Sequence, residues 1–376
     1  MKEELAMINK NGTWERTSKP KDKHVIGVKW VYKTKLNPDG SIHKHKAKLV
    51  VKGYSQMAGV DYGDTFAPVA RHETIRLIVA LEAQYGWKIF HLDVKSAFLN
   101  EVLQEEIYVV QPDSFIVVGH EEKVYRLHKA LYGLKQAPRA WYSRIDSHFL
   151  QINSRRSQNE PTLYVKDCGN GKKIVVFLYV DDLLITSDGV DEIEEFKNSM
   201  LQVFEMTYLG VMRYFLGMEV HQIDDGIFLS QKKYANDLLK KFKLENCNPV
   251  STPLAVNEKL SKADGDAKAD VTQYRSLVGS LLYLTATRPD LMFCSSLLSR
   301  FMHSPSLTHF GVGKRVLRYL KGTADFGIWY SKSDGKVEGF VDSDWETTLL
   351  AAPALLACRF SLQAWRYSLE RRLAGA

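Results

Sequence analysis

An apolar run interrupted by two adjacent acids constrains this chain more than any other feature. In residues 172–188, KKIVVFLYVDDLLITSD, β-branched and aromatic residues surround Asp181 and Asp182. Carboxylates within an apolar strand cost several kcal/mol each, as an order of magnitude, unless a cation matches their charge. Successive strand residues point to opposite faces, so only a tight turn between 177–180 and 183–186 brings both acids into one cavity. The run predicts a hairpin whose tip suits Mg²⁺; a surface hairpin with Asp in its turn is the alternative.

A third carboxylate, Asp93, stands at the end of another predicted strand. Residues 89–99, IFHLDVKSAFL, form an extended run that follows a predicted helix over 73–87 and ends in a turn. Taken alone, Asp93 fits a strand-end turn residue or a helix cap. Together with the hairpin acids it would complete a site for two divalent ions. Such a site assists nucleotidyl transfer by making a 3′-hydroxyl more acidic and by neutralising charge on the leaving pyrophosphate.

A second predicted hairpin, residues 25–52 around the turn NPDG, is rich in lysine. On its second strand, alternate positions give one face lysines and the other face apolar residues, the two sets being Lys44, Lys46, Lys48 and Lys52, and Ala47, Leu49 and Val51. Lys29, Lys33 and Lys35 form a similar row on the first strand. The pattern allows a solvated hairpin face or a flap whose point charges close over phosphates.

Composition bounds the function classes. The chain has 376 residues, 45% of them hydrophobic and 25% charged, which is typical of a globular protein, and its net charge of +7 is compatible with a polyanionic partner. The first residues lack the apolar core of a secretory signal, and no apolar run approaches the ~18 residues of a membrane span. We therefore expect an intracellular location, in a cytoplasmic particle or the nucleus. The four cysteines have no Cys-x-x-Cys spacing, which argues against a structural zinc site.

The motifs along the chain resemble a known family. The matching segments include KWVYKTKLNPDGSIHKHKAKLVVKGYSQ, LDVKSAFLN, YRLHKALYGLKQAPRAWY, FLYVDDLLI, YFLGMEV and YRSLVGSLLYLTATRPD. They resemble the reverse transcriptase of copia-type long-terminal-repeat retrotransposon Pol polyproteins over residues 11 to 345. The resemblance implies an RNA-directed and DNA-directed DNA polymerase, a nucleotidyltransferase that takes an RNA or DNA template-primer and deoxynucleoside triphosphates, with Mg²⁺ or Mn²⁺. It also implies that the chain is a piece of a longer polyprotein.

The fold that this resemblance implies is α+β: a right-hand polymerase with fingers, a thumb and an antiparallel palm sheet, followed by a mostly helical connection and a degenerate C-terminus. The expected domains are residues 11–250 for the polymerase, 251–335 for the helical connection and 336–376 for a truncated ribonuclease H start with an aberrant tail. The segments YFLGMEV and GIFLSQ are expected as strands.

The resemblance also assigns site residues. Asp93 and Asp181 become the main metal ligands, with Asp182 nearby and the Val94 carbonyl as a further ligand. Phe98 matches the bulky residue that crowds a sugar 2′-position and favours deoxynucleotides; a core phenylalanine is its alternative. The expected nucleotide-binding residues are Phe98, Lys46, Lys48, Gly133, Lys135 and Pro138. Leu216 and Gly217 resemble the primer grip, with an ordinary strand kink as the alternative.

Departures from the family pattern limit what is expected. Asp342 matches the first metal ligand of a ribonuclease H domain, but the text after Trp345 no longer follows the family, so that activity is not predicted and a change of reading frame is our hypothesis. Glu101 stands where the family has glycine, and a glycine-dependent φ there would be strained. Two alternatives stay open: an inactive transposon remnant and a nucleic-acid-binding module without chemistry.

Overall fold

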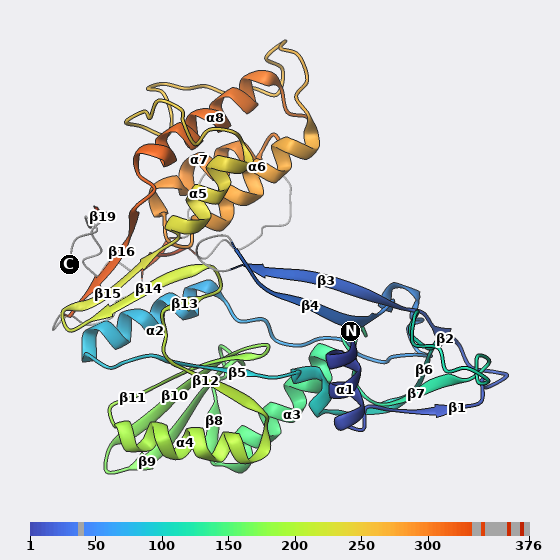
Figure 1. Ribbon diagram of the computed structural model, residues 1–376. Helices are drawn as coiled ribbons and strands as arrows, with labels where there is room; N and C mark the ends of the chain where they lie inside the picture. The colour runs from blue at the N-terminus through green and yellow to red at the C-terminus, as the bar shows by residue number, and fades with distance from the viewer. Residues whose placement is uncertain (37–40, 333–339, 343–358, 362–368, 372–376) are drawn as a thin grey trace, which may run out of the picture. The chain divides into compact units, whose positions relative to one another are not determined.

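The computed structural model describes residues 1–36 and 41–332, together with three short strands at 340–342, 359–361 and 369–371. These residues form two compact units, each discontinuous in sequence (Figure 1). The first unit comprises Met1–Arg71 and Ile89–Gly210, and the second comprises His72–Lys88 and Val211–Ala376. Both mix helices with β-sheet, as the sequence predicts.

The first unit contains two larger sheets and a separate hairpin. Its helices are α1 (Lys2–Lys10), η1 (Gly53–Ser55), η2 (Ala97–Asn100), α3 (Ala137–Gln151) and α4 (Val190–Val203). The six-stranded sheet has the order β12 (Met206–Val211), β5 (Phe90–Val94), β11 (Asp182–Ser187), β10 (Lys172–Tyr179), β9 (Leu163–Gly169) and β8 (Ser154–Arg156). The four-stranded sheet has the order β1 (Trp14–Thr17), β7 (Val124–Lys129), β6 (Val102–Val109) and β2 (Val25–Ile26).

One of the two core clusters of this unit lies between the six-stranded sheet and the helices α3 and α4, which cover one face of the sheet (Figure 1). Apolar residues at helical spacing, such as Trp141 and Phe149 on α3 and Phe196 on α4, pack against strand residues such as Leu92 and Leu183. Because the core fixes one face of β5, β10 and β11, the strand ends that carry the acids are held at one edge of a rigid layer.

The lysine-rich segment forms the predicted hairpin. Strand β3 (Val28–Leu36) pairs antiparallel with β4 (Ile42–Val51), and Lys33 lies opposite Lys46. Leu49 and Val51 are buried in an apolar cluster, while Lys46 on the alternate face is exposed. The prediction of one lysine face and one apolar face is therefore confirmed on β4.

The second unit combines a helical core with a sheet. Its helices are α2 (His72–Tyr85), α5 (Lys232–Lys241), α6 (Val271–Leu284), η3 (Pro289–Leu291), α7 (Met292–Ser299) and α8 (Leu307–Gly322). Its five-stranded sheet has the order β13 (Tyr214–Phe215), β14 (Met218–Ile223), β15 (Gly226–Ser230), β16 (Phe326–Ser331) and β19 (Leu369–Arg371), and β17 (Phe340–Asp342) pairs with β18 (Arg359–Ser361). Helix α2 joins this unit by packing on β15 and β16. None of the described helices combines the length and apolar character that a bilayer crossing needs.

Two local expectations are corrected. The segment YFLGMEV is not one strand, because Leu216 and Gly217 have φ of 46° and 80° and form a tight turn that joins β13 to β14. Glu101 has φ of −107° and ψ of 137°, which is ordinary extended backbone. The expectation of strain at Glu101 is therefore wrong, since the chain needs no left-handed residue there.

Candidate functional site

The tip of the β10–β11 hairpin carries two of the three predicted acids. Tyr179 pairs with Asp182, so Val180 and Asp181 alone form the turn, which confirms the predicted tight hairpin. Val180 has φ of 55°, a left-handed conformation that a β-branched residue rarely adopts. Both turn carbonyls are held by hydrogen bonds: the Trp141 Nε1–H donates to the Val180 oxygen (2.6 Å), and the Val94 N–H donates to the Asp181 oxygen (2.7 Å). These two contacts fix a strained turn at the sheet edge.

The third acid lies directly across from this hairpin. Strand β5 pairs antiparallel with β11, and in that register Asp93 is opposite Asp182. Directly opposed residues share one face of a sheet, with Cβ atoms roughly 4.5–5.5 Å apart. Burial, followed by the negative charges of Asp181 and Asp182, raises the pKa of the Asp93 carboxyl above its ordinary value. Burial and then the Asp182 charge likewise raise the pKa of Asp181. The three acids therefore form one electrostatically coupled cluster that a cation would stabilise.

Asp182 has a partner that the sequence did not suggest. His91 lies two residues before Asp93 on the same face of β5, and its Nε2 is 2.6 Å from Asp182 Oδ1. This contact turns one Asp182 oxygen toward the imidazole. Within the part of the chain that the structure describes, no three His, Cys, Asp or Glu side chains are arranged to hold a metal ion together. Asp93 and Asp181 are carboxylates without such an imidazole contact, and two carboxylates fit Mg²⁺, an ion usually bound by one or two carboxylates plus waters and substrate phosphates.

The lysine face of β4 exerts an electrostatic effect on the same acid cluster. Lys48 and Lys46 oppose the rise in the pKa of Asp181, and Lys46 also opposes the rise for Asp93. Burial and then the neighbouring Lys46 charge lower the pKa of the Lys48 ammonium, while attraction by Asp181 resists that change. The charge of Glu4 on α1, a residue that the sequence analysis missed, also resists the fall in the pKa of Lys48. The hairpin lysines thus belong to the electrostatic environment of the acids.

Tyr132 is the second functional candidate that the sequence analysis missed. Lys48 Nζ lies 3.5 Å from the centre of its ring, and the Phe98 ring lies 4.8 Å away in a tilted arrangement. Burial and then the Asp181 charge raise the pKa of its hydroxyl well above its usual range. The available signal was an aromatic residue immediately before Gly133 in a segment of interleaved basic and aromatic residues. Tyr132 therefore contacts both Lys48 of the hairpin and Phe98, the residue expected near the sugar of the nucleotide.

The other predicted residues of this loop are Gly133, Lys135 and Pro138, and each has a defined structural environment. Gly133 has φ of +94°, and a Cβ on it would lie 2.2 Å from the Val51 carbonyl oxygen, so only glycine allows the loop to approach β4. Lys135 Nζ donates to the Tyr62 hydroxyl (3.0 Å) and lies 4.8 Å from the centre of that ring. Pro138, exposed in the first turn of α3, lines a small cavity that also reaches Val180.

Other predicted residues fall outside this cluster. Leu216 and Gly217 belong to the second unit, where the Tyr283 hydroxyl donates to the Leu216 carbonyl, and their role as a primer grip stays a prediction. Asp342 ends β17, and its side chain lies outside what the structure describes. The side chain of Val94 is buried in the core, and the use of its carbonyl as a ligand stays a prediction.

Comparisons with known proteins bear on this arrangement. Residues 11–256 match the family described as reverse transcriptase (RNA-dependent DNA polymerase). The chain is 39% identical over 338 residues to a retrovirus-related Pol polyprotein from transposon RE2 of Arabidopsis thaliana, and 38% identical over 353 residues to one from transposon TNT 1-94 of Nicotiana tabacum. The matches cover 89% and 92% of this chain but 23% and 27% of those polyproteins, so the chain spans about a quarter of their length. A solved foamy viral protease-reverse transcriptase in complex with double-stranded DNA is similar at a TM-score of 0.44 and 12% identity, over 85% of this chain and 48% of that one.

Proposed function

The chain belongs to the reverse transcriptase (RNA-dependent DNA polymerase) family, and on that premise we propose that it extends a primer with deoxynucleotides along an RNA or DNA template. One observation carries the proposal. Asp93 and Asp181 are half-buried acids of raised pKa, and they lie within the electrostatic reach of Lys46 and Lys48. Carboxylates beside cations are what a nucleotide triphosphate and its divalent ions require.

The proposed metal ligands are the carboxylates of Asp93 and Asp181, with the carbonyl of Val94. Two Mg²⁺ ions, or Mn²⁺ in their place, would supply Lewis-acid stabilisation of charge at the attacking and leaving oxygens. Burial and the neighbouring carboxylates raise the pKa of both acids, so ionising them is unfavourable without a counter-charge, which supports a bound cation. Asp182 acts alongside them as a carboxylate held in position by His91.

On the nucleotide side, Lys46 and Lys48 would bind the triphosphate as point charges. Lys48 reaches that position from above the ring of Tyr132, so binding phosphate exchanges a cation–π contact for an ion pair. Phe98, beside Tyr132, would limit the space at the sugar 2′-position and so exclude ribonucleotides. Lys135 and Pro138 would contact nucleotide or template from the loop that Gly133 shapes.

The domain plan is part of the same proposal. The six-stranded sheet with α3 and α4 would be the palm, and the β3–β4 hairpin would belong to the fingers. Residues 11–250 would include the thumb, residues 251–335 the helical connection, and residues 336–376 a truncated ribonuclease H start that retains Asp342. Deoxynucleoside triphosphates and a template-primer are the proposed substrates.

Primer extension tests the proposal. The chain, given an RNA template, a DNA primer, deoxynucleotides and Mg²⁺, is expected to extend the primer, and Asp181→Asn is expected to abolish extension. Asp191→Asn, which changes an exposed acid in the first turn of α4, is the matched control and is expected to leave extension unchanged. Equal extension by wild type and Asp181→Asn would refute the site. Template binding without extension by the wild type would favour the nucleic-acid-binding module, and neither binding nor extension would favour the inactive remnant.

A further inference from the structure

A short segment, residues 95–101, connects the strand of Asp93 to β6 and carries Phe98 within the turn η2. The residue before η2, Ser96, has φ of 52° and ψ of 46°, a left-handed conformation that residues other than glycine rarely adopt. Such a conformation persists only where the surrounding structure holds it in place, and it is frequent at functional sites. The contacts that hold Ser96 therefore also determine where Phe98 lies.

The side chain of Asn100 folds back over this turn. Its Nδ2 donates to the carbonyl oxygens of Ser96 (3.2 Å) and Ala97 (3.1 Å), and the backbone N–H of Leu99 also donates to the Ser96 carbonyl (2.8 Å). Because both partners of the side chain are carbonyl oxygens, the amide nitrogen, and not the amide oxygen, must face them. One amide group thus ties the end of η2 to the left-handed residue before it, with Phe98 enclosed between them.

The residues on both sides of Phe98 are anchored in different core clusters. Ala97 is buried with Trp141 of α3, whereas Leu99 is buried in the other cluster, which includes the apolar face of β4. Phe98 itself is half-buried and packs against both clusters, and its ring centre lies 4.8 Å from that of Tyr132. The ring therefore has a defined position only as long as the short turn between the two anchors keeps its shape.

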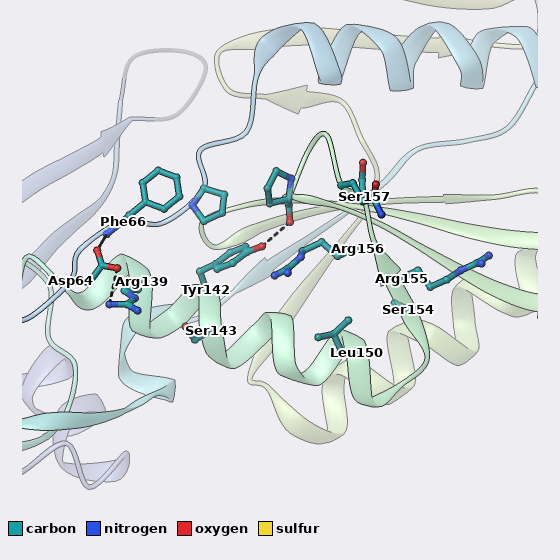
Figure 2. Close-up of a pocket in the computed structure, with 13 residues that line it drawn as sticks. Asp64, Phe66, Arg139, Tyr142, Ser143, Leu150, Ser154, Arg155, Arg156 and Ser157 are labelled. Atoms are coloured by element: carbon teal, nitrogen blue, oxygen red, sulfur yellow. Dashed lines mark hydrogen bonds and ion pairs between the residues drawn. The ribbon is translucent and has the colours of Figure 1, made fainter.

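Helix α3 supports η2 from one side. The turn packs against α3, where Trp141 belongs to the core. Another side of the same helix borders an open cavity, and Figure 2 shows Tyr142, Ser143 and Leu150 among the residues that line it. The buried side of α3 thus supplies a fixed surface for η2, while its open side faces the cavity.

Sugar discrimination requires a ring that cannot move aside. In the proposed function, Phe98 excludes ribonucleotides by occupying the space that a 2′-hydroxyl needs. An apolar pocket rejects an added hydroxyl only weakly, so the discrimination depends on how firmly the ring is held. A displacement of about 1 Å is enough to change the selectivity of a site. The hydrogen bonds that fix the turn therefore bear directly on the choice of substrate.

We propose that Asn100 is a positioning residue that fixes Phe98 and thereby sets the preference of the site for deoxynucleotides over ribonucleotides. It acts through its two hydrogen bonds to the backbone of the turn. This inference rests on the proposed function, because it takes Phe98 as the residue that meets the sugar, and it extends that function to a residue one step removed from the nucleotide.

The test compares Asn100→Ala with the wild type in single-nucleotide insertion, using a deoxynucleotide and the corresponding ribonucleotide. The quantity measured is the ratio of the two kcat/KM values, which does not depend on the fraction of folded protein because both values come from one sample. Asn100→Ala is expected to lower this ratio about tenfold, which corresponds to about 1.4 kcal/mol and is consistent with the loss of two hydrogen bonds. The deoxynucleotide value should fall less than about threefold, so the ribonucleotide value should rise, which a merely structural defect would not cause.

Two further variants control for the loss of an amide. Asn11 is half-buried like Asn100, and its Nδ2 donates to the carbonyl of Met7 (2.8 Å), four residues earlier, as Asn100 does to Ser96. Asn11→Ala is the matched control and is expected to leave the ratio unchanged. Asn100→Ser is expected to lower the ratio only about threefold, because a serine hydroxyl can still donate to a carbonyl three or four residues earlier. It provides the same test if Asn100→Ala does not fold.

The combination of Asn100→Ala with Phe98→Ala shows whether Asn100 acts through the ring. Two residues that act as a unit are not additive, so the double variant is expected to have the same ratio as Phe98→Ala alone. An unchanged ratio in both Asn100 variants, or a double variant whose ratio falls by the product of the two single effects, would overturn the inference while wild-type extension still supported the polymerase. Absence of extension by the wild type would instead refute the proposed function, and this inference with it.

Discussion

Trp141 is expected to control the turn that carries Asp181, and Trp141→Phe tests this directly. The indole is 1% exposed, and its Nε1–H donates at 2.6 Å to the carbonyl of Val180, the residue with φ of 55°. Phenylalanine keeps the apolar contacts but cannot donate. Leaving a buried carbonyl without its donor costs about 1–3 kcal/mol, and the void beside the smaller ring adds about 1 kcal/mol. The turn is therefore expected to lose about 2–4 kcal/mol of stability.

Hydrogen exchange of the Val94 amide measures this loss of stability at the turn itself. The Val94 N–H donates to the Asp181 carbonyl, so it exchanges when the turn opens. Because every 1.4 kcal/mol is a factor of ten, Trp141→Phe is expected to lower the protection of this amide by roughly 30-fold or more. Primer extension is expected to fall in parallel, since the Asp181 carboxylate loses its fixed position.

Trp14→Phe is the matched control. Trp14 is stacked on Tyr125 with ring centres 4.1 Å apart, and its Nε1–H donates to Asn9 Oδ1 in an exposed position. The same chemical change there is expected to cost less than about 1 kcal/mol, because water replaces the lost partner. If Trp141→Phe changed the protection of the Val94 amide no more than Trp14→Phe does, the claim that the indole holds the turn would be wrong.

Three further changes have expected outcomes. Burial and the Asp182 charge raise the folded-state pKa of Asp181, so ionisation of this carboxyl opposes folding at neutral pH. Without divalent ions, Asp181→Asn should therefore unfold at a higher urea concentration than the wild type at pH 7. The difference should disappear as the pH falls through the raised pKa toward the ordinary value of about 4. A constant difference across that range would contradict this. Gly133→Ala should lower the free energy of unfolding in urea by at least about 3 kcal/mol. Gly171→Ala is its control, because Gly171 has φ of +79° but open space where a Cβ would lie, and it should lower that free energy by only about 1–2 kcal/mol. Equal losses would exclude the close approach of Gly133 to β4 as the cause. Phe98→Ala should lower the preference for deoxynucleotides over ribonucleotides by about 10–100-fold in single-nucleotide insertion, and a loss of stability with unchanged preference would identify Phe98 as a core residue only.

The local pattern of the sequence was sufficient for the strands that carry the site. Two acids within an apolar run require a tight turn, and alternation assigns the β4 lysines to one face, because both rules depend only on neighbouring residues. YFLGMEV was expected as one strand, with a kink at Leu216 and Gly217 only as an alternative, because the segment is as apolar as a continuous strand. Because Phe215 pairs with Met218, only Leu216 and Gly217 are left to form the turn, and both have positive φ.

What only the tertiary structure decided are the partners. The register of β5 against β11 puts Asp93 opposite Asp182 and lets His91 reach the Asp182 carboxylate, although these strands are about ninety residues apart in sequence. Likewise, the loop before α3 brings Tyr132 under Lys48, and α2 leaves its sequence neighbours to pack in the second unit. Such contacts arise from the packing of distant segments around shared cores, and no periodicity within one segment specifies them. The sequence determined which side chains are candidates for the site, and the tertiary structure determined which of them are in contact.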